Sequence, residues 1–174
     1  MSSNQDLPLP VKQDPKPRGF RADIQGLRAI AVGIVVLYHF WGHYLPGGFV
    51  GVDVFFVISG FLITSHLIAK PPKNLADVGH FWMRRVKRLI PASFLVILCS
   101  VAGIWIFAPQ TVWQDWGLQA IAATFYFQNW FLALTKVDYL AEGDAPSPFQ
   151  HFWSLSAEEQ FYFVWPILIG LLIF

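Results

Sequence analysis

The sequence has few charged residues and a single cysteine, and both shortages limit what the protein can be. Of its 174 residues only 13% are charged, whereas soluble domains carry roughly 25%. The 12 basic and 11 acidic residues nearly cancel, so no nucleic-acid-binding footprint is present and no nucleic acid partner is expected. Cys99 lies in an apolar run, and as the only cysteine it excludes an intrachain disulfide.

The first 26 residues lack apolar runs and are rich in polar residues and proline, which predicts a disordered tail over residues 1–26. A cleavable signal peptide is not expected, because the first apolar run contains Arg28 and His39. The tail is therefore expected to remain, with the first apolar run as an uncleaved membrane anchor.

In contrast to its low charge, the sequence contains long apolar runs, and 55% of its residues are hydrophobic. About 20 apolar residues are needed to cross a bilayer, and four runs approach this length: residues 27–45, 49–69, 89–108 and 152–174. The turn Pro46-Gly47-Gly48 predicts a helical hairpin from the first two. The fold class expected is an all-α polytopic membrane protein, with four or five membrane segments of a larger bundle.

The distribution of lysine and arginine predicts the orientation. Basic residues gather in the tail and in residues 70–88, and such segments are usually cytoplasmic. The connection 109–151 holds one lysine against four acids and is expected outside. The aromatic-rich stretch 118–134 is then interpreted as interfacial or re-entrant. The protein is expected in the cell membrane, in contact with lipid, with its N-terminus in the cytoplasm.

Arg28 and His39 are eleven positions apart, which places them on one helix face about 16 Å from each other. Ionisable residues in a membrane span are costly and suggest function. Arg28 would hold a phosphate or carboxylate near the cytoplasm, and His39 would act deeper as a base or nucleophile. The alternative, equally weighted from these residues alone, is that Arg28 snorkels to the headgroups and His39 hydrogen-bonds a neighbouring helix.

The turn region adds His43 and Asp53. His43 follows His39 by four positions, but two histidines are too few for zinc, so no metal is expected and His43 is interpreted as interfacial, near Tyr44. Asp53 would orient His39 or His43 across the hairpin, or cap the second helix. The glycines around it lack the phosphate-loop pattern and favour close helix approach. Ser59-Gly60 is interpreted as another site of close packing.

Two further segments carry charge. In residues 80–88, Arg85 and Arg88 are three apart and can converge on one anion, either a lipid headgroup or the phosphates of a nucleotide-bearing donor. In residues 151–160, Ser156 and Glu159 fit a capping box at a helix start. That account leaves Glu158 free to accept a proton or to bind a hydroxyl.

Four segments of the sequence carry a family resemblance: RADIQGLRAIAVGIVVLYHF, LPGGFVGVDVFFVISGFLIT, FWMRRVKRLIPA and HFWSLSAEEQFYFVWP. In these segments, which occur in family order, the sequence resembles the membrane acyltransferase-3 family, which O-acylates cell-surface glycans. The stretch VDYLAEGDAPSPFQHFWSLS is most similar to the subgroup fused to an extracytoplasmic SGNH-type domain. Residues 27–174 are then expected to form an incomplete acyltransferase-3 membrane domain.

The resemblance implies transfer of an acyl group, in the simplest case acetyl, from cytoplasmic acyl-coenzyme A to a glycan or lipid-linked saccharide. It places donor binding at Arg28, Arg85 and Arg88. His39 would be the catalytic centre, assisted by Glu158 or Asp53. Two other classes stay open: a non-catalytic scaffold or transport fragment, and an inactive truncation product that needs a second chain to supply the missing helices.

Overall fold

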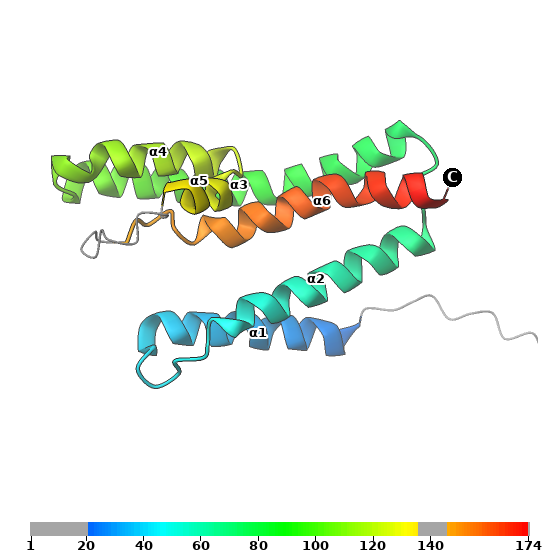
Figure 1. The fold of residues 1–174 in the computed structure, drawn as a ribbon, viewed down its shortest axis with the longest axis horizontal. Coiled ribbons are helices and arrows are strands. Elements are labelled where there is room, and N and C mark those ends of the chain that lie inside the picture. The colour runs from blue at the N-terminus through cyan, green and yellow to red at the C-terminus, as the bar shows by residue number, and fades with distance from the viewer. Residues whose placement is uncertain (1–20, 136–145, 174) are drawn as a thin grey trace, which may run out of the picture.

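The computed structural model describes residues 21–135 and 146–173, which form helices and no strands. The elements are α1 (Ala22–Trp41), α2 (Val50–Ala69), α3 (Leu75–Phe107), the 3₁₀ turn η1 (Gln110–Val112), α4 (Trp113–Thr124), α5 (Gln128–Thr135) and α6 (Phe152–Ile173). In Figure 1, α1 and α2 form an antiparallel hairpin, α3 to α6 gather beside it, and α2 approaches α6. The predicted all-α class is confirmed.

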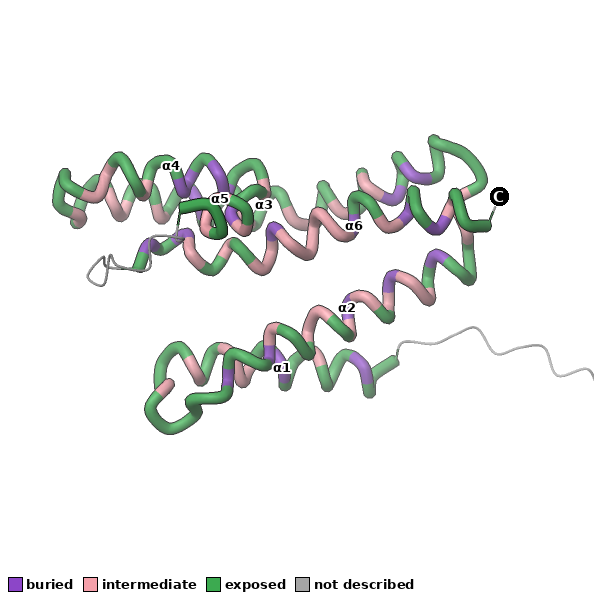
Figure 2. Tube along the Cα trace, viewed as in Figure 1, coloured by how far each residue is buried: buried purple, intermediate pink, exposed green. Residues whose placement is uncertain are grey.

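Three helices of the described residues are long and apolar enough to cross a membrane: α1, α2 and α3. The expected fourth span, α6, is 22 residues long but is not among them, and its first half carries Glu158, Glu159 and Gln160. Figure 2 shows that buried residues occur only at intervals along the helices. Many large apolar side chains are exposed, as expected where hydrocarbon or further helices cover a helix.

The largest differences between the predicted and the observed helix boundaries are at the starts of α1 and α3. Helix α1 begins at Ala22, five residues before the start of the predicted span, and residues 1–20 of the predicted tail lie outside the described residues. Helix α3 is 33 residues long, about 50 Å at the usual rise. It begins at Leu75, capped by Asn74, whose side chain accepts a hydrogen bond from the Asp77 amide at 2.9 Å. Most of the basic segment is therefore helical and continuous with the third span.

The aromatic-rich stretch 118–134 is not one helix. Helices α4 and α5 have 12 and 8 residues, each shorter than the ~20 residues that cross a bilayer. The break falls at Tyr126, whose φ is 55°. Its hydroxyl lies 2.8 Å from Ser93 Oγ, which connects the break to α3.

A polar network holds this break against α6. The Gln160 side chain donates to the Tyr126 carbonyl at 2.8 Å and to Asn129 Oδ1 at 2.9 Å. The fully buried Gln128 donates to Gln119 Oε1 at 3.0 Å, and its backbone N–H donates to Ser156 Oγ at 3.3 Å. These bonds satisfy polar groups that would otherwise be costly to bury.

The predicted capping box is wrong. Helix α6 starts at Phe152, so Ser156 and Glu159 lie inside it and no acid stands in its first turn. Ser156 is fully buried and serves the network instead. Asp53 also caps nothing, because α2 begins at Val50 and has no side-chain cap.

The α1–α2 hairpin depends on glycine, as the sequence predicts. A Cβ on Gly51 would lie 2.5 Å from the Ala31 carbonyl oxygen, and one on Gly48 would lie 2.5 Å from Tyr38 Cβ. These distances are far inside van der Waals contact, so only glycine fits here. The close approach fixes α1 against α2 over the length that carries His39 and Asp53.

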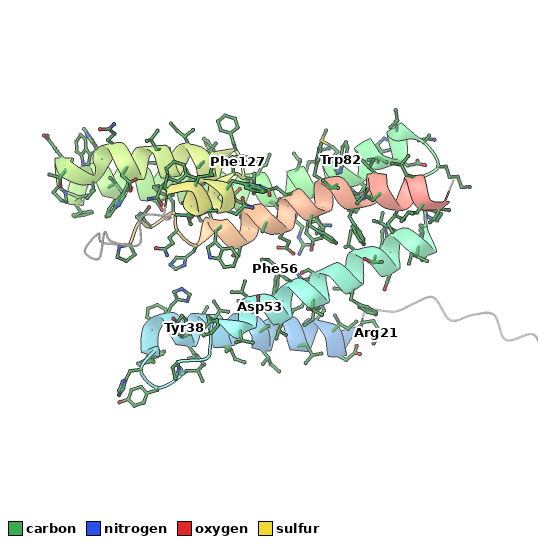
Figure 3. The ribbon with its side chains drawn as sticks, viewed as in Figure 1. Arg21, Tyr38, Asp53, Phe56, Trp82 and Phe127 are labelled. Atoms are coloured by element: carbon green, nitrogen blue, oxygen red, sulfur yellow. The ribbon has the colours of Figure 1, made fainter. Side chains whose placement is uncertain are left out.

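A hydrophobic cluster joins α2, α3 and α6. Its buried members are Ile63, Leu67, Phe81, Tyr162 and Ile169. Beside it, the Trp82 ring, labelled in Figure 3, stacks on Phe163 with centroids 4.5 Å apart. Trp165 of α6 also donates from Nε1 to Thr64 Oγ1 of α2 at 2.8 Å. The cluster positions α6 relative to the hairpin and the basic end of α3.

Replacing Gly51 by alanine is expected to weaken the hairpin. The new Cβ would meet the Ala31 carbonyl and, at 2.8 Å, the Val35 side chain, so the helices must separate. Overpacking of this kind costs about 1–3 kcal/mol of unfolding free energy. Denaturation of the detergent-solubilised protein, followed by circular dichroism, measures the loss.

Gly60→Ala is the matched control on the same helix. The sequence suggests close packing at Gly60, but no atom lies within 4 Å of its added Cβ, so that interpretation is wrong for this residue. Because alanine favours helix over glycine, this variant should equal or exceed the wild-type stability. Equal stability of the Gly51 and Gly60 variants contradicts the close contact.

Candidate functional site

Two cavities lie along the helices that carry the predicted site residues. The first has a volume of about 560 Å³ and is called the arginine cavity here, because Arg28 of α1 and Arg84, Arg85 and Arg88 of α3 line it. Its other polar lining includes His66 of α2 and Glu158, Glu159 and Tyr162 of α6. The three arginines predicted to act together are therefore brought together, from two helices far apart in the sequence.

Arg85 is partly buried and is held by contacts with aromatic rings and a carboxylate. Its guanidinium carbon lies 3.2 Å from the centre of the Tyr162 ring and 5.5 Å from that of Phe81. Its Nε atom is 3.9 Å from Glu159 Oε1, and both side chains are mostly buried. A cation over an aromatic face is attracted by the ring quadrupole, so α6 holds Arg85 in place.

Arg28 reaches the same cavity from α1. Its guanidinium carbon lies 4.8 Å from the centre of the Phe55 ring on α2. Arg84 and Arg88 are exposed and have no carboxylate partner within the described residues. Four arginines face two carboxylates, so the cavity carries an excess of positive charge. Guanidinium groups in such a setting suit phosphate or carboxylate groups.

The second cavity, of about 1050 Å³, lies at the other end of the hairpin and is called the histidine cavity here. Its polar lining comprises Tyr38, His39, Asp53, Gln150, His151 and Ser154. Figure 3 shows Phe56 of α2 directed into the space between α2 and α6, where its ring meets that of Trp153 at 6.1 Å.

The tautomer of His39 follows from one contact. Its Nδ1 atom lies 2.7 Å from the Val35 carbonyl oxygen. Because a carbonyl only accepts, the ring donates from Nδ1, and in the neutral ring Nε2 then carries the free lone pair. The imidazole is exposed to the cavity and is suited to accept a proton there.

The two predicted assisting carboxylates lie in different cavities. Asp53 lines the histidine cavity with His39, although Val35 and not Asp53 holds the Nδ1 atom. Glu158 lines the arginine cavity and accepts a hydrogen bond from the Tyr162 hydroxyl at 2.5 Å. Glu158 therefore lies in a different cavity from the imidazole, and Asp53 lies in the same one.

His43 lies outside both cavities and meets the Tyr44 ring edge-on at 5.3 Å. In the part of the chain that the structure describes, no three histidine, cysteine or acidic side chains come close enough to hold a metal ion.

Comparison with known proteins gives the same family that the sequence motifs indicate. The acyltransferase domain family matches residues 21–173. The chain belongs to the acyltransferase-3 family. It is 42% identical over 153 residues to the peptidoglycan O-acetyltransferase OatA of Listeria monocytogenes, covering 87% of this chain and 24% of that protein. It is 45% identical over 151 residues to the O-acetyltransferase OatA of Staphylococcus aureus, covering 86% and 25%.

The chain thus spans about a quarter of the length of the curated relatives it matches. No solved structure matches it.

Several residues that line the two cavities were not predicted from the sequence, and Tyr162 and His151 are the two that contact predicted site residues most closely. Tyr162 lies four positions after Glu158 and three after Glu159, a spacing that places all three on one helix face. That spacing could have identified it. His151 begins the charged segment 151–160, and nothing in the sequence indicates that it meets His39.

The contact between Arg85 and Tyr162 is tested by two substitutions. Tyr162→Phe keeps the ring face and loses only the hydroxyl, whereas Tyr162→Leu removes the ring. The leucine variant should be less stable than the phenylalanine variant by about 0.5–2 kcal/mol, the range of a cation–π contact. Chemical denaturation in detergent compares them, and equal stabilities contradict the assignment.

Proposed function

We propose that this chain forms the donor site and the reaction centre of a membrane O-acyltransferase, which transfers an acetyl group from acetyl-coenzyme A to a hydroxyl of a cell-envelope glycan. The observation that carries the proposal is the convergence of four arginines on one cavity, on the α1 face that also presents His39. The family and the names of the two relatives support acetyl as the acyl group and peptidoglycan as the acceptor.

Arg28, Arg85 and Arg88 bind the phosphates of the donor. Coenzyme A carries a pyrophosphate and a ribose phosphate, so it presents several anionic oxygens at one end. Planar guanidinium groups bind such oxygens through paired, charge-assisted hydrogen bonds. Arg28 and Arg88 come from different helices, which allows the cavity to contact the nucleotide end from two sides.

His39 lies about 16 Å from Arg28 along α1, a separation that the long pantetheine arm of the donor is suited to bridge. There the free Nε2 takes the proton of the acceptor hydroxyl as its oxygen attacks the thioester carbon. The C–S bond then breaks, and the imidazolium returns the proton to the leaving thiolate. Asp53, beside His39 in the same cavity, orients the acceptor.

The direction of transfer follows from the charge distribution. The basic start of α3 and the N-terminus lie on the cytoplasmic side of the cell membrane, and the histidine cavity lies toward the outside. The donor therefore enters from the cytoplasm and the glycan or lipid-linked saccharide from the exterior. Further helices, from the same gene product or a second chain, complete the walls of the two cavities.

His39→Ala should abolish glycan acetylation in the complete gene product that contains this chain, while membrane insertion stays normal. His43→Ala is the matched control, since it removes an imidazole one turn away that lines neither cavity. Acetylation is measured as ester-linked acetate released from isolated cell-wall glycan. Retained acetylation in the His39 variant contradicts the proposal.

Arg88→Ala should raise the KM for acetyl-coenzyme A by about tenfold or more, the value of one lost hydrogen bond to a charged group. Its kcat should change less, because Arg88 lies far from the reacting thioester. Lys87→Ala is the control, as it removes a neighbouring charge that does not line the arginine cavity. Initial rates over a range of donor concentrations separate KM from kcat, and equal KM values for both variants contradict donor binding at Arg88.

A further inference from the structure

The ring of His151 lies against the ring of His39. Their centroids are 4.4 Å apart and their planes are nearly perpendicular, at 84°. His39 stands near the end of α1, whereas His151 directly precedes α6, so the fold brings the two imidazoles together from distant parts of the sequence. Both rings are exposed to solvent and line the histidine cavity.

The surroundings of this pair suit a hydroxylated ligand. Asp53 of α2 and Gln150 and Ser154 beside His151 provide hydrogen-bonding groups, and Tyr38 and Trp153 provide aromatic rings. Carboxylate, amide and hydroxyl groups bind sugar hydroxyls, while aromatic rings cover the apolar face of a sugar ring. Apart from the two histidines, Asp53 and Tyr38 are the titratable groups that line this cavity.

Protonation of the His151 ring is disfavoured in this setting. Desolvation of its ring, and secondly the neighbouring His39, lower the pKa of His151 below its ordinary value. A neutral imidazole has one donor and one acceptor. In its neutral form His151 can therefore both donate and accept a hydrogen bond beside His39.

We propose that His151 is a second catalytic imidazole, which holds the acceptor hydroxyl against His39. This inference rests on the proposed function. A ring nitrogen of His151 hydrogen-bonds the acceptor oxygen and directs the O–H toward Nε2 of His39. The O–H bond breaks as the Nε2–H bond forms, the oxygen bonds the thioester carbon, and the proton passes from His39 to the thiolate. His151 neither gains nor loses a proton in this sequence.

Ring packing alone would account for the edge-to-face contact. The variants are therefore chosen to separate a packing role of His151 from a hydrogen-bonding role. His151→Phe keeps an aromatic ring of similar shape but removes both hydrogen-bonding nitrogens. His151→Asn and His151→Gln remove the ring but retain an amide that both donates and accepts, at the reach of Nδ1 and Nε2 respectively. Steady-state acetyl transfer by the complete gene product is measured for each, with acceptor and donor varied separately.

His151→Phe should lower kcat/KM for the acceptor by about tenfold or more, as expected for a lost hydrogen bond to the substrate. The KM for the donor should stay unchanged, and either the Asn or the Gln variant should recover most of the loss. Wild-type rates in the Phe variant overturn the proposal. So does an equal, complete loss in all three variants with normal helical content, since that result assigns an obligatory proton transfer to His151.

A second measurement separates this inference from the proposed function. The pKa of His151, followed by NMR of the ¹⁵N-histidine-labelled chain in detergent, should rise in the His39→Gln variant, because His39 lowers it in the wild type. An unchanged pKa shows that the rings do not interact and overturns the inference even if acetylation occurs. Absence of acetyl transfer in the wild type, with the pKa change present, overturns the proposed function and leaves only the contact between the two rings established.

Discussion

The Arg85 guanidinium over the Tyr162 ring is the contact on which the rest of the arrangement depends. A cation in apolar surroundings is costly unless aromatic faces or anions surround it. Arg85 meets this requirement through Tyr162 and Glu159, both on α6, and through Phe81 on its own helix. Helix α6 is therefore held beside the basic start of α3, and its first half is brought to both cavities.

Further contacts along α6 show how one helix relates the two sites. Near its end Trp165 hydrogen-bonds Thr64, and near its start Trp153 meets Phe56. Between them Glu158 faces the arginine cavity, and just before the helix His151 faces His39. The arginine cavity and the histidine cavity thus lie in sequence along α6 and the α1–α2 hairpin, in the order that the proposed donor, with its charged end and its reactive end, requires.

Much of the fold and part of the candidate site could be predicted from the sequence, and the features that could not be predicted have physical causes. Apolar run length and turn chemistry predicted the hairpin. The spacing of Arg85 and Arg88 placed these two side chains together, and the family resemblance added Arg28, which lines the same cavity. Helical periodicity is a local signal, so it could place Arg28 and His39 on one face but could not show that His151 reaches His39 across the fold. The capping-box prediction was wrong because the Ser156 hydroxyl can either cap a helix start or accept a hydrogen bond from a buried backbone N–H. Only the packing of α5 on α6, which brings the Gln128 N–H to Ser156, decides between the two. The 118–134 stretch was divided by a left-handed residue, Tyr126, that no sequence pattern marks.

The central claim is that the arginine cavity recognises the phosphates of the donor while the thioester extends toward His39. Equilibrium binding of coenzyme A, dephospho-coenzyme A and pantetheine to the detergent-solubilised gene product tests it most directly. The structure predicts that affinity falls in that order, that added salt weakens coenzyme A binding most, and that Arg28→Ala reduces the differences between the three ligands. Equal affinities for all three, insensitive to salt and to Arg28→Ala, would contradict the account.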